Sequence, residues 1–138
     1  PCPPALKAVE SGDFFAAWGG IASLQWSLPA VWTAGREAGV TFDQLARWLS
    51  AAPAKLAGLA GRKGVIAPGA DADLVVWEPD ASFVVHPEKT YHRHKLSPYI
   101  GRTLYGVIEK TYLRGRLVAE KGVVRAGAMG RLVRGRGR

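Results

Sequence analysis

The chain has 138 residues, of which 48% are hydrophobic and 22% charged, a balance that predicts a folded globular protein and excludes a disordered one. Nineteen Lys and Arg against 11 Asp and Glu give a net charge of +8, so a nucleic-acid partner has to be weighed. The single cysteine, Cys2, excludes an internal disulfide framework, and no apolar run reaches the ~20 residues that cross a bilayer.

The chain opens in a proline-rich segment at Pro1, with no initiator Met and with neither the basic region nor the apolar stretch of a signal peptide. We therefore expect a cytoplasmic chain that lacks its N-terminal part. A helix is predicted over residues 21–37, with a bend at Pro29 because proline removes a backbone donor. The residues that form its apolar stripe are Ile21, Leu24, Leu28, Val31 and Trp32.

The next segment carries two helix signals. Thr41 followed three residues later by Gln44 has the form of a capping box, which predicts a helix that runs to about Ser50. Pro53 suits the first turn of another short helix, which we expect to extend through Leu59.

From Gly64 onward the hydrophobic pattern becomes typical of strands. Residues 65–66 and 73–77 flank the turn segment 67–70 and predict a hairpin. Further strands are predicted at residues 82–85, 106–113, 116–119 and 123–125, with turns at Gly115 and at residues 121–122.

The C-terminal residues 130–138 are predicted to form a basic, flexible tail. Three of its arginines fall in the final segment, residues 134–138. One hypothesis is that this tail is an RNA-binding arm, but no interleaved aromatic side chains accompany it to stack on bases. A solvated terminus without a nucleic-acid partner is the favoured interpretation.

Several blocks of the chain resemble the amidohydrolase superfamily. Residues 63–77, KGVIAPGADADLVVW, resemble the stretch in which that family passes from its last barrel helix into a small β-domain. Residues 50–54, SAAPA, are similar to the family's Thr-x-Asn-Pro-Ala signature, with Ala52 at the Asn position. Residues 97–106, SPYIGRTLYG, and 111–115, TYLRG, resemble the return strands of the β-domain in the cyclic-amidohydrolase branch.

Within this branch the sequence most resembles the allantoinases. The matching blocks are residues 1–4, PCPP, residues 17–25, AWGGIASLQ, and residues 91–99, YHRHKLSPY. The resemblance implies an α/β fold that is the C-terminal part of a metal-dependent hydrolase (β/α)8 barrel plus part of a small β-sandwich domain. Residues 1–62 would then be the last barrel helices and loops, 63–129 the β-rich domain and 130–138 the tail.

The resemblance also implies a function, cleavage of the ring amide of allantoin to allantoate by a cytoplasmic homo-oligomer. Two zinc ions bridged by a carboxylated lysine would be held by an N-terminal barrel half outside this sequence, and no membrane is involved. The catalytic Asp would come from an Asp-His-Ser triplet that directly precedes the first block in allantoinases and is not in this sequence. We therefore expect this chain to be inactive by itself.

The resemblance places a substrate pocket at Gly19, Gly20 and Ile21, with Cys2 and Pro3 near its mouth. Two glycines before a helix let the backbone approach a ligand and direct amide donors at it. The alternative is a tight loop that only turns the chain. The chemistry of the Cys2 thiol is not expected to contribute, because no basic residue close in sequence would lower its pKa.

The histidines and two of the aspartates have side chains that can bind metal ions or act in catalysis. His92 and His94 form a His-x-His pair of the kind that binds zinc, but the metal pair of this family lies near the N-terminus, so no metal ligand is expected here. Asp71 and Asp73 are interpreted as structural carboxylates at a turn. His86 has no partner at ligand spacing and is expected at the surface.

Two alternative functions remain open. One keeps the enzyme class and changes the ring, to that of a hydantoinase or dihydropyrimidinase or of a dihydroorotase. The other is a stand-alone, non-catalytic module that binds RNA through its arginine-rich tail.

Overall fold

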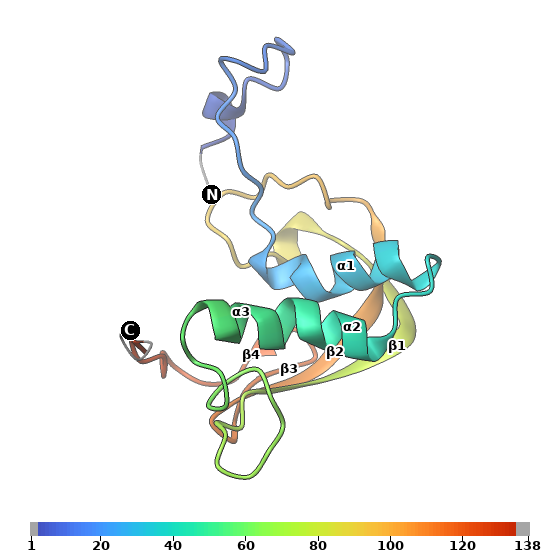
Figure 1. Cartoon of the computed structure of the whole chain (residues 1–138). Coiled ribbons are helices and arrows are strands. Elements are labelled where there is room, and N and C mark those ends of the chain that lie inside the picture. Colours follow the sequence, from blue (N-terminus) through green and yellow to red (C-terminus); the bar gives the residue numbers. More distant parts are fainter. Residues whose placement is uncertain (1–2, 135–138) are drawn as a thin grey trace.

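A computed structural model describes residues 3–134 as an α/β arrangement in which helices lie on one side of an antiparallel sheet (Figure 1). The segment before the first α-helix, blue in Figure 1, extends away from the helices and sheet. The α-helices are α1 (Ser27–Arg36), α2 (Phe42–Ala46) and α3 (Ala52–Leu56), and 3-10 turns occur at Pro4–Lys7, Leu24–Trp26 and Pro87–Lys89. Within residues 3–134, no helix has the length and apolar character required to span a bilayer.

Helix α1 begins later than the sequence predicts. A 3-10 turn at Leu24–Trp26 precedes it, and the α-helix proper starts at Ser27, so the predicted start at Ile21 is wrong. Pro29 therefore stands in the first helical turn, where backbone N–H groups have no acceptor within the helix, and its ring interrupts no helical hydrogen bond.

The buried face of α1 also differs from the predicted stripe. Trp32 is buried as expected, but Leu24 is 96% exposed and Ile21 is 59% exposed. The buried positions repeat every three residues along the helix. They are Trp26, Pro29, Trp32 and Gly35. Leu28 and Val31, the other members of the predicted stripe, are only partly buried.

The capping box at Thr41 is confirmed. The Gln44 amide donates to Thr41 Oγ1 at 3.2 Å, and the Thr41 amide donates to Gln44 Oε1 at 2.8 Å. The helix then continues through a π-helical turn at Arg47–Ala51 into α3. The short helix predicted at Pro53 is confirmed, with Pro53 in its first turn, but it ends at Leu56 and not at Leu59. The Ala52 amide donates to the Arg47 carbonyl five residues earlier, a wider turn that accommodates Pro53, which has no N–H.

The sheet has the order β1-β2-β3-β4, and every neighbouring pair is antiparallel. Its strands are β1 (Leu74–Val84), β2 (Thr103–Leu113), β3 (Arg116–Glu120) and β4 (Val123–Val124). The predicted segments at 73–77 and 82–85 belong to one strand, β1, which bulges between Glu78 and Ser82. The later strands and their turns at Gly115 and residues 121–122 are confirmed.

The predicted hairpin at residues 65–66 is wrong. These residues lie in the loop that links α3 to β1, and Ile66 is 88% exposed. A strand of two residues needs a partner, and here the loop is held instead by bonds such as that from the Asp71 amide to the Arg62 carbonyl, at 2.9 Å.

Two aromatic clusters join the helices to the sheet. Trp26, Val85 and Leu104 form a buried core with Phe83, Tyr99 and Ile100 packed against it. Nearby, the Trp32 ring lies 5.6 Å from the Trp77 ring at 84° and 5.1 Å from the Phe42 ring. Edge-to-face pairs of this kind stabilise a fold beyond the area that they bury. These clusters fix α1 against β1 and β2.

Candidate functional site

A hollow of about 950 Å³ lies where the N-terminal segment meets the loop before α1. Four of the five residues predicted for the pocket line it: Pro3, Gly19, Gly20 and Ile21. The fifth, Cys2, lies outside the described residues. The other lining residues are Leu6, Lys7, Val9, Phe14, Trp18, Ala22, Leu96, Ser97 and Pro98. The hollow thus brings together segments that are far apart in the sequence.

Lys7 is a charged residue among those that line this hollow. Its Nζ atom donates to the carbonyl oxygens of Trp18 at 3.0 Å and Gly19 at 3.1 Å, and also to that of Gly20. The Trp18 amide donates to the Leu6 carbonyl at 2.8 Å. The glycine loop is therefore tied to the 3-10 turn at Pro4–Lys7. Sequence analysis missed Lys7, because nothing in its local pattern distinguishes it from a surface lysine.

The backbone conformation at position 20 requires a glycine. Its φ is +87°, and a Cβ built on it would meet nothing within 4 Å. The position therefore needs glycine for the left-handed backbone and not for space. Among residues 3–134, the backbone amides of Gly19, Gly20 and Ile21 donate to no other group. The loop consequently presents unused hydrogen-bond donors.

Gln25 connects the segment before α1 to the loop between β1 and β2, and each of these segments contributes other residues to the lining of the hollow. Its Nε2 donates to the Lys89 carbonyl at 2.9 Å, and its Oε1 accepts from the Tyr91 amide at 2.8 Å. The Lys95 ammonium donates to the Thr90 carbonyl in the same segment. The loop between β1 and β2, yellow to orange in Figure 1, is thereby held beside the N-terminal segment. Gln25 lies in a motif quoted for the family resemblance, but its role depends on a contact 64 residues away in the sequence.

The His-x-His pair is not arranged as a metal site. His92 and His94 lie in a bent loop and not on a strand. His92 Nε2 is buried and meets no hydrogen-bond partner among residues 3–134. Burial lowers the pKa of His92, and the nearby Lys95 charge lowers it further, so this imidazole is neutral at pH 7. The His86 side chain is half exposed, and its Nδ1 lies 3.6 Å from Glu88 Oε1, which agrees with the surface position predicted for His86.

The described residues do not fit a metal ion. No group of three or more His, Cys, Asp or Glu side chains within residues 3–134 is arranged to hold one.

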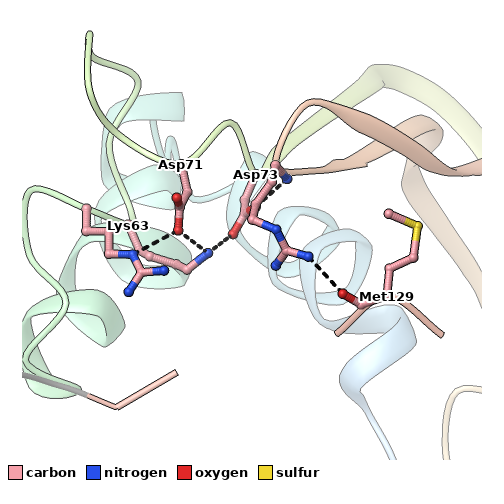
Figure 2. Close-up of polar contacts among 6 residues, drawn as sticks. Lys63, Asp71, Asp73 and Met129 are labelled. Carbon is pink, nitrogen blue, oxygen red and sulfur yellow. Dashed lines mark hydrogen bonds and ion pairs between the residues drawn. The ribbon is translucent and has the colours of Figure 1, made fainter. Parts of the chain in front are cut away.

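Asp71 and Asp73 flank the Lys63 ammonium, as Figure 2 shows. Lys63 Nζ lies 2.9 Å from Asp71 Oδ2 and also contacts Asp73 Oδ2, while Arg62 Nε donates to Asp71 at 3.1 Å. The Arg114 amide, in the turn between β2 and β3, donates to Asp73 Oδ1 at 2.8 Å. The cluster joins the end of the helical segment to the sheet, in line with the structural role predicted for the two carboxylates.

The pairing changes the pKa values of the cluster. Hydrogen bonds to Asp73 and Asp71 raise the pKa of Lys63. The bond from Lys63 lowers the pKa of Asp71. Burial raises the pKa of Asp73, but the bonds from Lys63 and from the Arg114 amide outweigh it, and the net pKa is lowered. All three groups are therefore charged at pH 7.

Comparison with known proteins places this chain in a class of hydrolases. The model of the amidohydrolase family matches residues 10–118, and the chain belongs to that family. Members of the family are generally metal-dependent hydrolases, and those of the allantoinase type act on small molecules.

The chain is similar in sequence to curated allantoinases. It is 46% identical to the allantoinase of Arabidopsis thaliana over 134 residues, which is 96% of this chain and 26% of that protein. It is 46% identical to the allantoinase of Rubrobacter xylanophilus over 135 residues, 97% of this chain and 29% of that protein. The chain thus spans about a quarter of the length of the curated relatives that it matches.

Solved structures of hydantoinases share the fold. A D-hydantoinase (dihydropyrimidinase) from Thermus sp. superposes with a TM-score of 0.80 at 26% identity over 92% of this chain and 28% of its own. The L-hydantoinase (dihydropyrimidinase) from Arthrobacter aurescens superposes with a TM-score of 0.75 at 34% identity over 81% of this chain and 25% of its own.

Proposed function

We propose that this chain forms part of an allantoinase-type enzyme that hydrolyses the ring amide of allantoin to allantoate. The observation that carries the proposal is its 40–48% identity to proteins named allantoinase or probable allantoinase from a slime mould, plants, bacteria and yeast, over 86–97% of the chain. The hydantoinase structures are 26–34% identical over 81–92% of the chain and support the related cyclic-amide chemistry as the alternative.

In this proposal the chain supplies the C-terminal part of a larger molecule. Residues 1–62 complete a (β/α)8 barrel, residues 63–129 form part of a β-sandwich domain, and residues 130–138 are a tail. The exposed apolar side chains support this arrangement, because monomeric proteins rarely leave large apolar patches in water. They include Phe14, Phe15, Leu24 and Leu56, each at least 90% exposed. We propose that an N-terminal barrel half covers them.

The substrate pocket is proposed at the hollow lined by Pro3, Gly19, Gly20 and Ile21, with Cys2 at its mouth. The unused amides of the glycine loop are suited to bind a carbonyl oxygen of the ring, since backbone N–H groups directed at a ligand are effective donors. The apolar residues around them, such as Trp18 and Leu96, would contact the flat faces of the ring and exclude water.

The metal ions belong elsewhere in the proposed enzyme. Because residues 3–134 offer no ligand set, we propose that two zinc ions bridged by a carboxylated lysine are held by the N-terminal barrel half. When bound, such ions supply hydroxide at neutral pH. The chain alone is then inactive. The homo-oligomeric state and the cytoplasmic location stay predictions from the sequence.

The proposal is tested with a hybrid enzyme, in which residues 3–134 replace the matching quarter of the Rubrobacter xylanophilus allantoinase. Its kcat/KM is measured for allantoin, hydantoin, dihydrouracil and dihydroorotate. The proposal expects allantoin to be the best substrate by at least about tenfold, a difference of ~1.4 kcal/mol in transition-state binding. A preference for another of these rings would assign the pocket to that alternative.

A further inference from the structure

We propose that Lys7 positions the backbone of Gly19–Ile21 to bind a carbonyl oxygen of the substrate, a role that rests on the pocket proposed above. The Lys7 ammonium donates to the carbonyl oxygens of Trp18, Gly19 and Gly20. An ammonium group has three donors and no acceptor. The three contacts therefore use its full hydrogen-bonding capacity, and they all fall on consecutive residues of one loop.

The planar peptide bond converts these contacts into an arrangement of amides. In a trans peptide unit the carbonyl of one residue points opposite to the N–H of the next, and no peptide bond within residues 3–134 is cis. The carbonyls of Trp18, Gly19 and Gly20 face the ammonium, so the amides of Gly19, Gly20 and Ile21 are directed away from it. These are the same amides that donate to no other group among the described residues.

The Lys7 charge also strengthens these donors. A cation bonded to a carbonyl oxygen polarises the whole peptide group, and successive amides with one orientation form a concave site for an electron-rich oxygen. The ligand class is therefore a carbonyl oxygen of a cyclic amide or ureide. Lys7 does not touch this oxygen itself, since its donors are already bound, and so it is a positioning residue.

The test uses the hybrid enzyme with three substitutions. Lys7→Met keeps the length of the side chain and removes its charge and donors, and Lys7→Arg keeps a cation with donors at the same place. Lys55→Met is the matched control, because Lys55 is an exposed lysine of α3 that does not line the hollow. For each variant, kcat and KM for allantoin and the melting temperature are measured.

We expect Lys7→Met to raise KM on the order of tenfold with a smaller change in kcat, which corresponds to the loss of a well-placed hydrogen-bonding group. Its melting temperature should stay close to that of Lys55→Met, and Lys7→Arg should recover most of the lost affinity. A KM within twofold of the unmodified hybrid would overturn the proposal. So would an equal loss in Lys7→Arg, or a loss of activity that only follows a lower melting temperature. An unmodified hybrid that binds and hydrolyses no cyclic amide would instead refute the proposed function.

Discussion

The Thr33 hydroxyl accepts a hydrogen bond from the Tyr105 backbone amide at 2.7 Å, and it thereby joins the middle of α1 to the start of β2. The same hydroxyl donates to the Pro29 carbonyl at 2.7 Å. One turn further along α1, the Arg36 guanidinium lies 3.9 Å from the centre of the Tyr105 ring. The contacts of Thr33 and Arg36 with Tyr105 hold α1, the helix that follows the glycine loop, against the sheet.

We predict that Thr33→Val destabilises the hybrid enzyme by about 1–3 kcal/mol, because valine keeps the shape of threonine but leaves the half-buried Tyr105 amide without an acceptor. Thr33→Ser is the control, since it keeps the hydroxyl and loses only a methyl group. Denaturant unfolding monitored by tryptophan fluorescence measures both. Equal stability of the Val and unmodified proteins would show that the bond contributes nothing.

Gly64→Ala is predicted to destabilise the junction between α3 and the loop that follows. Gly64 has φ +75°, and an added Cβ would lie 2.6 Å from the Ser50 carbonyl oxygen and 2.8 Å from the Ala54 Cβ. We expect a cost of about 2–4 kcal/mol, from left-handed strain together with overlap against backbone. Gly69→Ala is the control, because Gly69 has φ +84° but open space around it, so only strain of about 1–2 kcal/mol applies. Equal losses in melting temperature for the two variants would contradict the close approach.

The Lys63 cluster predicts a pH-dependent contribution to stability. The pKa values of Asp71 and Asp73 are lowered by folding, so their contribution is present above about pH 4 and is lost as the pH falls through their folded values. The pKa of Lys63 is raised by folding, so its contribution is present below about pH 10 and is lost at higher pH.

Lys63→Met should therefore lower the melting temperature at pH 7 and have a smaller effect below about pH 4 and above about pH 10. Lys55→Met should show no such dependence. A loss in Lys63→Met that is the same at every pH would mean that packing of the lysine stem, and not its charge, stabilises the junction.

The exposed apolar side chains predict self-association of the chain when it is expressed alone. Phe15 and Leu24 are fully exposed or nearly so, and Trp18 and Ile21 lie close to them in sequence and are more than half exposed. Sedimentation and the binding of a hydrophobic dye measure this association. The 138-residue chain alone should aggregate and bind the dye, whereas the hybrid enzyme should sediment as a single species and bind no dye. A soluble monomer that melts cooperatively would contradict the idea that these side chains require a covering partner.

Local signals in the sequence predicted part of the fold. The capping box at Thr41 depends on two residues three positions apart, and the turn at Gly115 depends on the need for a left-handed backbone, so both could be identified without the fold. The β-branched runs of β1 and β2 were equally clear. The pocket residues followed from the resemblance to a family and not from local chemistry.

The remaining features depend on contacts across the chain. When a helix has apolar residues on more than one face, the sequence does not show which face packs on the sheet. The predicted buried stripe therefore includes Leu24, but in the structure Leu24 is exposed and Trp26 is buried. Residues 65–66 have strand propensity but no partner strand. Lys7 and Gln25 act on carbonyls and amides that lie 11–13 and 64–66 positions away. The sequence around Lys7 and around Gln25 contains no local pattern that predicts such contacts.

The most direct test of the central claim is the rate of allantoin hydrolysis by the hybrid enzyme, compared with that of the Rubrobacter xylanophilus protein cut off before the matching quarter. If residues 3–134 complete an allantoinase-type enzyme, the hybrid turns over allantoin in a metal-dependent reaction and the shortened protein does not. A hybrid that folds and binds metal but leaves allantoin intact would contradict the account.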